Sequence, residues 1–307
     1  MPQSWTVGGL RVHRIDETTF PPGTGSWILP DAATPEVVRR FPWLQPDFAT
    51  PDGGLLMSSH TFAFEAADGR RVLVDTGVGN GRKRANPFWN DLDTPYLDRL
   101  AEAGFAPDSV DLVVLTHLHT DHVGWNTRDD GGTWVPTFPR ARYLTSRAEW
   151  DHWASVEMEE SRRQMFRDAV LPVRDAGLLD LVDVEEGGTE IAPGVRLLPA
   201  PGHTPGQFAV ELTDGAGATG GTETALITGD SVHHPVQLGD PALNSRVDSD
   251  PEDAVRSRRA LLDRLADSGA LLLGTHFPPP TAGRVRREGD AYRLEPVAPV
   301  VTPSAAG

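Results

Sequence analysis

The chain has 307 residues, of which 38% are hydrophobic and 23% charged, with a formal net charge of −16 and no cysteine. This length and composition predict a soluble globular fold with a sizeable core, and they exclude a disordered or disulfide-stapled chain. The acidic balance disfavours nucleic acid and anionic membranes as partners.

The N-terminal part of the chain predicts short strands followed by a long irregular segment. Met1 to Leu10 has no basic region before an apolar run, and no stretch reaches the length of a membrane span, so we expect a cytoplasmic protein. Alternating apolar positions predict strands between Trp5 and Phe20. Pro21 to Gly54 is rich in Pro, Gly and aromatic residues, with one short helix expected at Pro35 to Arg40. This segment either wraps the core or forms a lid or dimer contact near a functional site.

Strands and helices alternate through the rest of the chain. We see no domain linker, and predict one domain over residues 1–307, with 1–54 as an N-terminal extension packed on it and 296–307 as a flexible tail. The first predicted elements are a hairpin over 55–75, a solvated loop over 78–90 that contains Arg82, Lys83 and Arg84, and a helix opened by Thr94 and Pro95. A strand over 140–145 and a helix over 148–170 follow, and then strands over 195–199, 207–212 and 224–228 with a flexible tip at 214–221. The last predicted elements are a helix over 251–266 capped by Asp250, a strand over 270–273 and a closing hairpin over 284–294.

Metal-ligand residues are concentrated in one stretch, Thr116-His117-Leu118-His119-Thr120-Asp121-His122. It follows the apolar run from Leu112 to Leu115, which predicts a buried strand. A single histidine at the end of a strand is usually a hydrogen-bonded surface residue, as we expect for His13 and His152. Packing does not require three imidazoles and a carboxylate within six positions, whereas a cation such as zinc takes nitrogen and oxygen ligands of this kind.

Three later segments place further ligand residues beside apolar runs. They are Ala200-Pro201-Gly202-His203-Thr204-Pro205-Gly206, then Thr228-Gly229-Asp230 after Ala225 to Ile227, and His276 after Leu271 to Leu273. Together with the 116–122 stretch, this series resembles the signature of the metallo-β-lactamase superfamily, from about Leu55 onward. The resemblance implies an α+β fold, the four-layer αββα sandwich.

The resemblance also implies two divalent metal ions, most simply zinc, with manganese, iron or cobalt as alternatives. His117, His119 and His203 would hold one ion, Asp121, His122 and His276 the other, and Asp230 would bridge the two. A hydroxide between the ions would attack the substrate, oriented by Asp121 and Asp230. Asp121 or His233 would return a proton to the leaving group, with His234 as the alternative residue that points inward.

Two side chains near these motifs keep two interpretations each. Asp75 resembles the carboxylate that supports a metal-binding histidine in the family, or else it caps a turn. Trp125 either lines the substrate pocket or packs in the core.

The motifs favour a dinuclear metal-dependent hydrolase of a small-molecule ester or lactone. A phosphotriesterase is the main alternative, because the run from Gly229 to Gln237 resembles methyl parathion hydrolase. A β-lactamase, a thioester hydrolase and a non-catalytic binding module fit less well, and a homodimer stays open.

Overall fold

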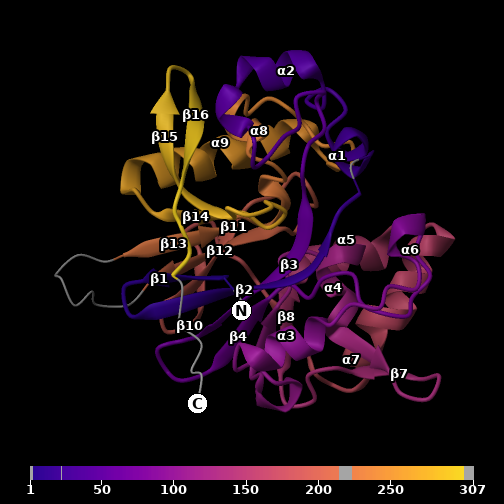
Figure 1. The fold of residues 1–307 in the computed structure, drawn as a ribbon. Coiled ribbons are helices and arrows are strands. Elements are labelled where there is room, and N and C mark those ends of the chain that lie inside the picture. The colour runs from indigo at the N-terminus through magenta and orange to yellow at the C-terminus, as the bar shows by residue number, and fades with distance from the viewer. Residues whose placement is uncertain (1–2, 22, 214–222, 301–307) are drawn as a thin grey trace, which may run out of the picture.

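The computed structural model describes residues 3–21, 23–213 and 223–300, and it contains two seven-stranded sheets (Figure 1). The predicted tip at 214–221 and the end of the predicted tail, 301–307, lie outside the described residues. In the described parts of the chain, no helix combines the length and the apolar character needed to span a bilayer.

The first sheet takes its strands from the N-terminal part of the chain, in the order β1-β2-β3-β4-β5-β8-β9. Its strands are β1 (Gln3–Val7), β2 (Leu10–Thr19), β3 (Ser58–Glu65), β4 (Arg71–Val74), β5 (Leu112–Val114), β8 (Arg142–Ser146) and β9 (Leu179–Val182). From β4 to β9 neighbouring strands are parallel. A small separate sheet pairs β6 (Thr127–Asp129) with β7 (Trp134–Pro136).

The second sheet runs in chain order from β10 to β16 and is antiparallel except for the pair β13 and β14. Its strands are β10 (Thr189–Ala192), β11 (Val195–Pro199), β12 (Phe208–Thr213), β13 (Thr224–Ile227), β14 (Leu271–Leu273), β15 (Ala282–Glu288) and β16 (Ala291–Pro296). The parallel register aligns Ala225 with Leu271 and Ile227 with Leu273, so both strands end at the same edge of the sheet.

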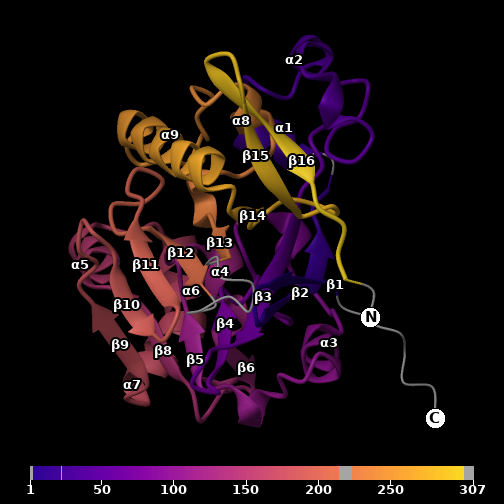
Figure 2. The same ribbon diagram turned by 90° about the vertical axis from the view of Figure 1, so that its left-hand side faces the viewer.

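Side-chain alternation along the strands produces three apolar layers. In β14, Leu271 and Leu273 enter the layer shared by the two sheets, while Leu272 enters the layer on the outer side of the second sheet. In β4, Val72 and Val74 enter the shared layer, and Leu73 enters the layer on the outer side of the first sheet. Helices cover both outer layers, which confirms the predicted αββα sandwich (Figure 2).

The helices are short except for one on the outer side of the second sheet. Their bounds are α1 (Gly23–Ile28), α2 (Pro35–Arg40), α3 (Tyr96–Glu102), α4 (Thr120–Val123), α5 (Arg147–Ser155), α6 (Glu160–Met165), α7 (Leu171–Asp175), α8 (Val236–Gly239) and α9 (Pro251–Ser268), with a π-helical turn at Phe166–Val170. The predicted cap of α9 is confirmed, because the Asp250 carboxylate accepts the backbone N–H groups of Glu252 and Asp253. Gly269 ends the helix in the left-handed conformation, with a φ of 67°.

The helix predicted over 148–170 is wrong as a single element. Val156 is extended and separates α5 from α6. Trp153 and Phe166 lie on the two sides of this break, and their ring centroids are 6.3 Å apart. In one straight helix these positions would be separated by about 20 Å along the axis. The chain therefore turns back so that both rings reach the outer layer of the first sheet.

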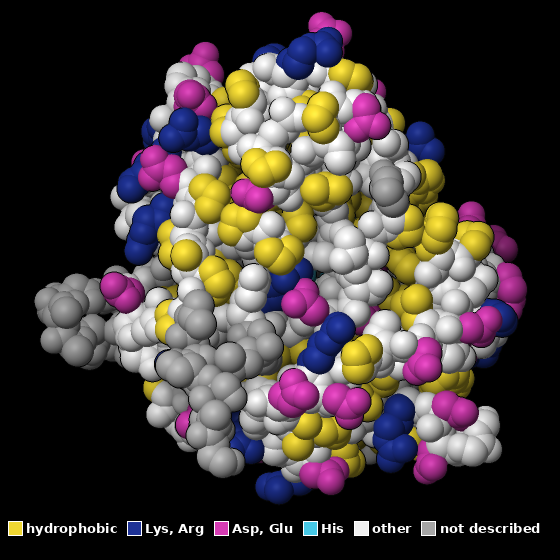
Figure 3. Space-filling model, viewed as in Figure 1, with side chains coloured by type: hydrophobic (Ala, Val, Ile, Leu, Met, Phe, Trp, Pro, Cys, Tyr) yellow, Lys and Arg dark blue, Asp and Glu magenta, His cyan; other side chains and the backbone are white. Residues whose placement is uncertain are grey.

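The N-terminal residues divide between a sheet and a covering segment. Residues 3–19 form β1 and β2, which are strands of the first sheet. The domain prediction instead places these residues in an extension packed on the domain. The helix expected at Pro35 to Arg40 is confirmed as α2. Phe20, Leu44 and Phe48 enter the outer apolar layer of the second sheet, so this segment does wrap the core. In Figure 3 hydrophobic side chains gather over the upper part of this face, where Figure 1 places α1 and α2.

The basic cluster in the 78–90 loop is not solvated as predicted. Arg82 and Arg84 are buried, whereas the Lys83 side chain is exposed. Arg84 Nη1 lies 2.9 Å from Asp168 Oδ2, in an ion pair whose side chains are both almost fully buried. The guanidinium carbon of Arg82 lies 3.9 Å from the centroid of the Trp134 ring. A buried carboxylate stabilises the charge of Arg84 and an aromatic face stabilises that of Arg82, although the sequence pattern predicts that both are solvated.

Candidate metal centre

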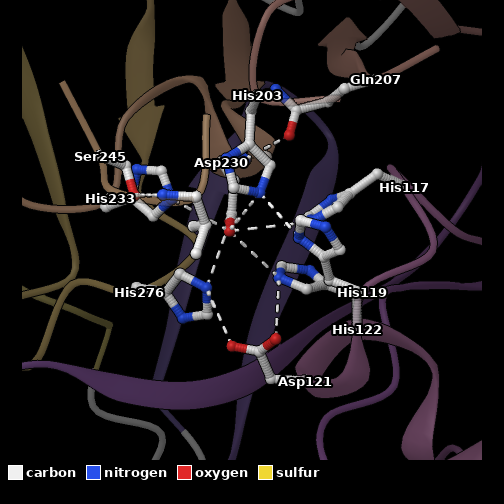
Figure 4. Close-up of polar contacts among 12 residues, drawn as sticks. His117, His119, Asp121, His122, His203, Gln207, Asp230, His233, Ser245 and His276 are labelled. Atoms are coloured by element: carbon white, nitrogen blue, oxygen red, sulfur yellow. Dashed lines mark hydrogen bonds and ion pairs between the residues drawn. The ribbon is translucent and has the colours of Figure 1, made fainter. Parts of the chain in front are cut away.

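The seven predicted ligand residues meet at one edge of the sandwich, where several strands end (Figure 4). The loop after β5 carries His117 and His119, and it runs directly into α4, which carries Asp121 and His122. The loop between β11 and β12 carries His203. Asp230 and His276 follow the parallel strands β13 and β14, so the register of these two strands brings their side chains together.

Asp230 lies at the middle of the cluster. Its Oδ2 atom is 3.4 Å from Nε2 of His122 and 3.4 Å from Nε2 of His203. Nε2 of His117 lies 3.8 Å from the same oxygen. The other carboxylate oxygen, Oδ1, is 3.2 Å from Nε2 of His276. One buried carboxylate therefore faces imidazoles contributed by both sheets, which is the placement expected of a bridging ligand.

Donor atoms lie close enough to hold two cations. Three groups bring their ligand atoms within 4.8 Å of one another: His117, His119 and His203; Asp121, His122 and His276; and His117, His122 and Asp230. The first two groups coincide with the two predicted ligand sets, and the third connects them through Asp230. A fourth group of the same kind consists of His203, His233 and Asp248.

Buried polar atoms in the cluster fit a metal better than they fit one another. Nε2 of His117, Nε2 of His122 and Oδ1 of Asp230 are buried without a hydrogen-bond partner. An unsatisfied buried polar atom costs about 1–3 kcal/mol, so three that converge need a ligand that accepts their lone pairs. Nitrogen and oxygen donors without sulfur suit zinc, manganese, iron or cobalt.

The pKa values of His117 and His119 fit the same conclusion, whereas a cation bound by His122 would have to displace a proton. Burial lowers the pKa of His117 and of His119 well below the usual histidine value, which leaves neutral rings with lone pairs. Burial acts in the same direction on His122, but neighbouring carboxylates, Asp230 first, outweigh it and raise its pKa well above the usual value. Burial would raise the pKa of Asp230, yet the nearby histidines, His276 first, hold it well below the usual value.

Asp75 supports the centre from outside, which decides between its two interpretations. Its Oδ2 atom lies 2.9 Å from Nδ1 of His122 and accepts the hydroxyl of Thr116 at 2.8 Å. Its Oδ1 atom accepts the Thr116 backbone N–H at 2.8 Å. Asp75 has a φ of 58°, a left-handed conformation that aspartate tolerates better than most residues. The carboxylate thus orients one imidazole and anchors the start of the metal loop.

Asp248 plays the corresponding part for His203, and sequence reasoning missed it. Its Oδ1 atom lies 3.0 Å from Nδ1 of His203, and its Oδ2 atom accepts the Ser245 backbone N–H at 2.8 Å. Nδ1 of His276 instead lies 3.0 Å from the backbone oxygen of Ser58. No ligand motif surrounds Asp248, and a backbone oxygen leaves no mark in a sequence, so only the tertiary structure identifies these partners.

Glu149 connects the loop after β5 with the loop that carries His203, and sequence reasoning missed it as well. Its buried carboxylate accepts the backbone N–H of Leu118 at 2.9 Å and that of Gly206 at 3.2 Å, and the indole N–H of Trp153 at 2.7 Å. Leu118 lies between two predicted ligands, and Gly206 lies in the loop of His203. A glutamate in the first turn of an amphipathic helix reads as a surface residue, so the pattern around it gave no signal.

The structure separates the two adjacent histidines. His233 faces the centre, with Nε2 at 3.3 Å from Asp230 Oδ2, and neither of its ring nitrogens has a hydrogen-bond partner. His234 turns away, with Nε2 at 2.8 Å from the Phe48 backbone oxygen and Nδ1 at 3.0 Å from the Val236 backbone nitrogen. His234 therefore serves the fold, and His233 is the residue that points inward.

Trp125 belongs to the core. Its side chain is buried, and its ring stacks on Tyr96 with centroids 5.2 Å apart. Its indole N–H donates to Glu17 Oε1 at 2.7 Å. The core interpretation therefore holds for this residue.

Comparisons with known proteins agree with this geometry. Residues 55–276 match the family model described as the metallo-beta-lactamase superfamily. The N-acyl homoserine lactonase AiiB of Agrobacterium fabrum is 29% identical over 195 residues, which are 57% of this chain and 64% of that protein. An N-acyl homoserine lactonase of Bacillus cereus is 29% identical over 169 residues, 51% of this chain and 59% of that protein. The chain thus aligns with less than two thirds of the length of these relatives.

Solved structures share the fold over almost the whole chain. A structure described as AidC, a dizinc quorum-quenching lactonase in complex with a product, aligns with a TM-score of 0.76 at 20% identity and covers 98% of each chain. The hydrolase AbOPH, described as in the beta lactamase superfamily, aligns with a TM-score of 0.73 at 23% identity, also over 98% of each chain. At these identities the likeness concerns the fold alone.

Proposed function

Since the chain belongs to the metallo-beta-lactamase superfamily, we propose that it is a hydrolase that opens a lactone or cleaves an ester with two divalent cations, zinc before any other. One observation carries the proposal: the two predicted ligand sets converge, and Asp230 lies between them with an unpartnered buried oxygen. The lactonase activity named for the relatives favours a lactone as the substrate.

The proposed ligands are His117, His119 and His203 for one cation and Asp121, His122 and His276 for the other, with Asp230 between them. Such a pair would lower the pKa of a bound water molecule from about 15.7 towards about 7 and would polarise the carbonyl of the substrate. The protein residues then have to orient the attacking oxygen and to supply a proton to the leaving group.

Asp121 and His233 are the proposed proton carriers. Asp121 exposes 12% of its side chain, so its carboxylate lies on the open side of the centre, where substrate and solvent arrive. His233 is buried beside Asp230 and keeps both ring nitrogens unpartnered. Burial lowers the pKa of His233, and the charge of the Asp230 carboxylate partly offsets this effect and favours a proton at Nε2. A departing alkoxide is strongly basic and requires such a proton, whereas a nitrophenolate does not.

Leaving-group dependence tests the role of His233. We expect His233→Ala to slow an alkyl lactone by about 10²–10⁴-fold, the range of general acid catalysis. A 4-nitrophenyl ester should lose far less, because its leaving group departs without a proton. Steady-state kinetics on both substrates measures the difference, with metal content as a control for folding. Equal losses on both substrates would assign His233 to positioning rather than to proton transfer.

A substrate panel tests the activity itself. The metal-loaded protein is assayed on N-hexanoyl homoserine lactone, a 4-nitrophenyl ester, a phosphotriester and a cephalosporin. We expect the lactone or the ester to be turned over most efficiently, with phosphotriester hydrolysis as a weaker activity. Turnover of the cephalosporin alone would overturn the proposal, and a protein that purifies without metal and hydrolyses nothing would be a binding module.

A further inference from the structure

One side of the candidate metal centre is open, and an arginine lies beside it. His119 and Asp121 are partly exposed, whereas the other five proposed ligands are buried. Arg162, on α6, affects both of these residues electrostatically. Burial lowers the pKa of His119 and the charge of Arg162 lowers it further, while the carboxylate of Asp121 partly offsets the burial that lowers the pKa of Arg162.

The guanidinium of Arg162 is held in place by an aromatic ring and one long hydrogen bond. Its Cζ atom lies 4.5 Å from the centroid of the Trp153 ring. The same ring makes an edge contact with His119, with centroids 5.7 Å apart. Nη1 of Arg162 donates to the backbone oxygen of Leu118 at 3.4 Å, between two of the proposed ligands. These contacts orient the guanidinium but satisfy few of its five N–H donors.

No carboxylate within the described ranges completes an ion pair with Arg162 at 4.0 Å or less. Glu149 and Glu159 attract it from a greater distance, and Glu149 already accepts three N–H groups. Asp121 is a proposed metal ligand, so a cation would share its negative charge. A half-buried guanidinium in this position is preorganised for an anion that arrives from solution.

We infer that Arg162 binds a carboxylate group of the substrate, so that the preferred esters or lactones carry a second, negatively charged end. The inference rests on the proposed hydrolase function and names the class of substrate for that site. A cation beside the open side of the centre is also notable because the chain as a whole has a net charge of −16 and repels anions.

Two esters that differ only at their far end test this assignment. Mono-4-nitrophenyl glutarate ends in a carboxylate, and 4-nitrophenyl pentanoate ends in a methyl group at the same position. We expect Arg162→Gln to raise the KM of the glutarate ester by about tenfold or more, the effect of one lost charged hydrogen bond, with little change in kcat. The pentanoate ester should change by less than about threefold, and Arg162→Lys should recover part of the loss because it keeps the charge.

Arg163 offers a matched control on the same helix. Its Nε atom lies 3.0 Å from Glu160 Oε2, and its side chain is 47% exposed. Arg163→Gln removes the same charge one residue away and should leave both esters unaffected. Calorimetric titration of the metal-loaded protein with glutarate gives a second reading without turnover. Arg162→Gln should weaken glutarate binding by about tenfold, and Arg163→Gln should not.

Each outcome bears on the inference or on the proposed function separately. Equal loss on both esters, or a glutarate affinity that is the same in Arg162→Gln and the wild type, would overturn the role of Arg162. The wild type could bind glutarate but hydrolyse neither ester, with glutarate binding weakened in Arg162→Gln and not in Arg163→Gln. In that case the anion site stands and the proposed function fails. If Arg162→Gln loses its metal, Arg162→Lys takes its place in the comparison with Arg163→Gln. A selective loss on the glutarate ester in Arg162→Lys then supports the role of Arg162, and equal behaviour of the two variants overturns it.

Discussion

The two sheets supply the candidate centre in different ways. The first sheet contributes four proposed ligands from one short stretch, His117 to His122, directly after β5. The second sheet contributes His203, Asp230 and His276 from three separate loops. A local stretch needs only one turn into α4 to point its side chains together. Three separate loops converge only if the strands before them are aligned.

The residues that hold the ligands in place also differ between the 117–122 stretch and the three loops of the second sheet. Asp75 holds the compact stretch by the backbone N–H of Thr116 and the ring of His122, so one carboxylate orders its beginning and its end. In the second sheet each loop has its own support. Asp248 contacts His203, and the loop of Asp230 is fixed by Gln207, whose side-chain oxygen accepts the Asp230 N–H at 3.1 Å. The dispersed ligands therefore depend on more partners.

Loss of the central carboxylate tests whether the two parts form one centre. Asp230→Ala removes the proposed ligand whose carboxylate lies within 3.8 Å of His117, His122, His203 and His276, from both sheets, so we expect complete loss of hydrolysis and of at least one metal ion per chain. Metal content by mass spectrometry and the activity assay measure both effects. His152→Ala is the control, because its ring contacts Trp153 and no proposed ligand, and it should keep both properties. Equal damage from the two changes would mean that the ligand assignment is wrong.

The outer carboxylates sharpen the comparison one ion at a time. Asp75→Asn should weaken the ion bound through His122, and Asp248→Asn the ion bound through His203, each by about 10–100-fold in affinity. Asparagine keeps the shape, and it tolerates the left-handed backbone of Asp75. Competitive metal titration resolves the two binding steps. If both variants weaken the same step, the proposed division of ligands between two ions does not hold.

Acid should act on the second sheet through His234. Burial lowers the pKa of this residue to about 4, and Nδ1 must stay unprotonated to accept the Val236 N–H. Between pH 6.5 and about 4 the unfolded chain therefore binds a proton that the folded chain refuses, so stability falls as the pH falls. The share of His234 amounts to about 3 kcal/mol. Urea unfolding of metal-free protein at pH 7 and pH 4.5 measures the loss, which should be smaller in His234→Gln. Equal losses in both proteins would exclude this residue as the cause.

The smallest expected effect concerns the connection that leads to the strand of His276. Gly269 ends α9 with a φ of 67°, and apart from its chain neighbours no described atom lies within 4 Å of the position that a Cβ atom would take. Gly269→Ala should therefore cost only the backbone penalty of about 1 kcal/mol, which lowers the melting temperature by about 1–2 °C for a chain of this size. Metal content should stay unchanged. A loss of metal in this variant would show that β14 shifts with its connection, which would make the second sheet more fragile than we infer.

Local patterns alone determined much of this protein. A buried strand, the dense ligand stretch after it, the capped helix from Pro251 and the closing hairpin are encoded by neighbouring residues, and the sandwich follows from the resemblance they carry. The residues that support the ligands were decided only by the tertiary structure. Asp248, Glu149 and Arg162 are ordinary charged residues in their local sequence, because each obtains its role from a partner brought close by folding. The same reason explains the buried Arg82 and the broken helix at Val156: the free energy gained from distant contacts exceeds the local preference for water or for a continuous helix.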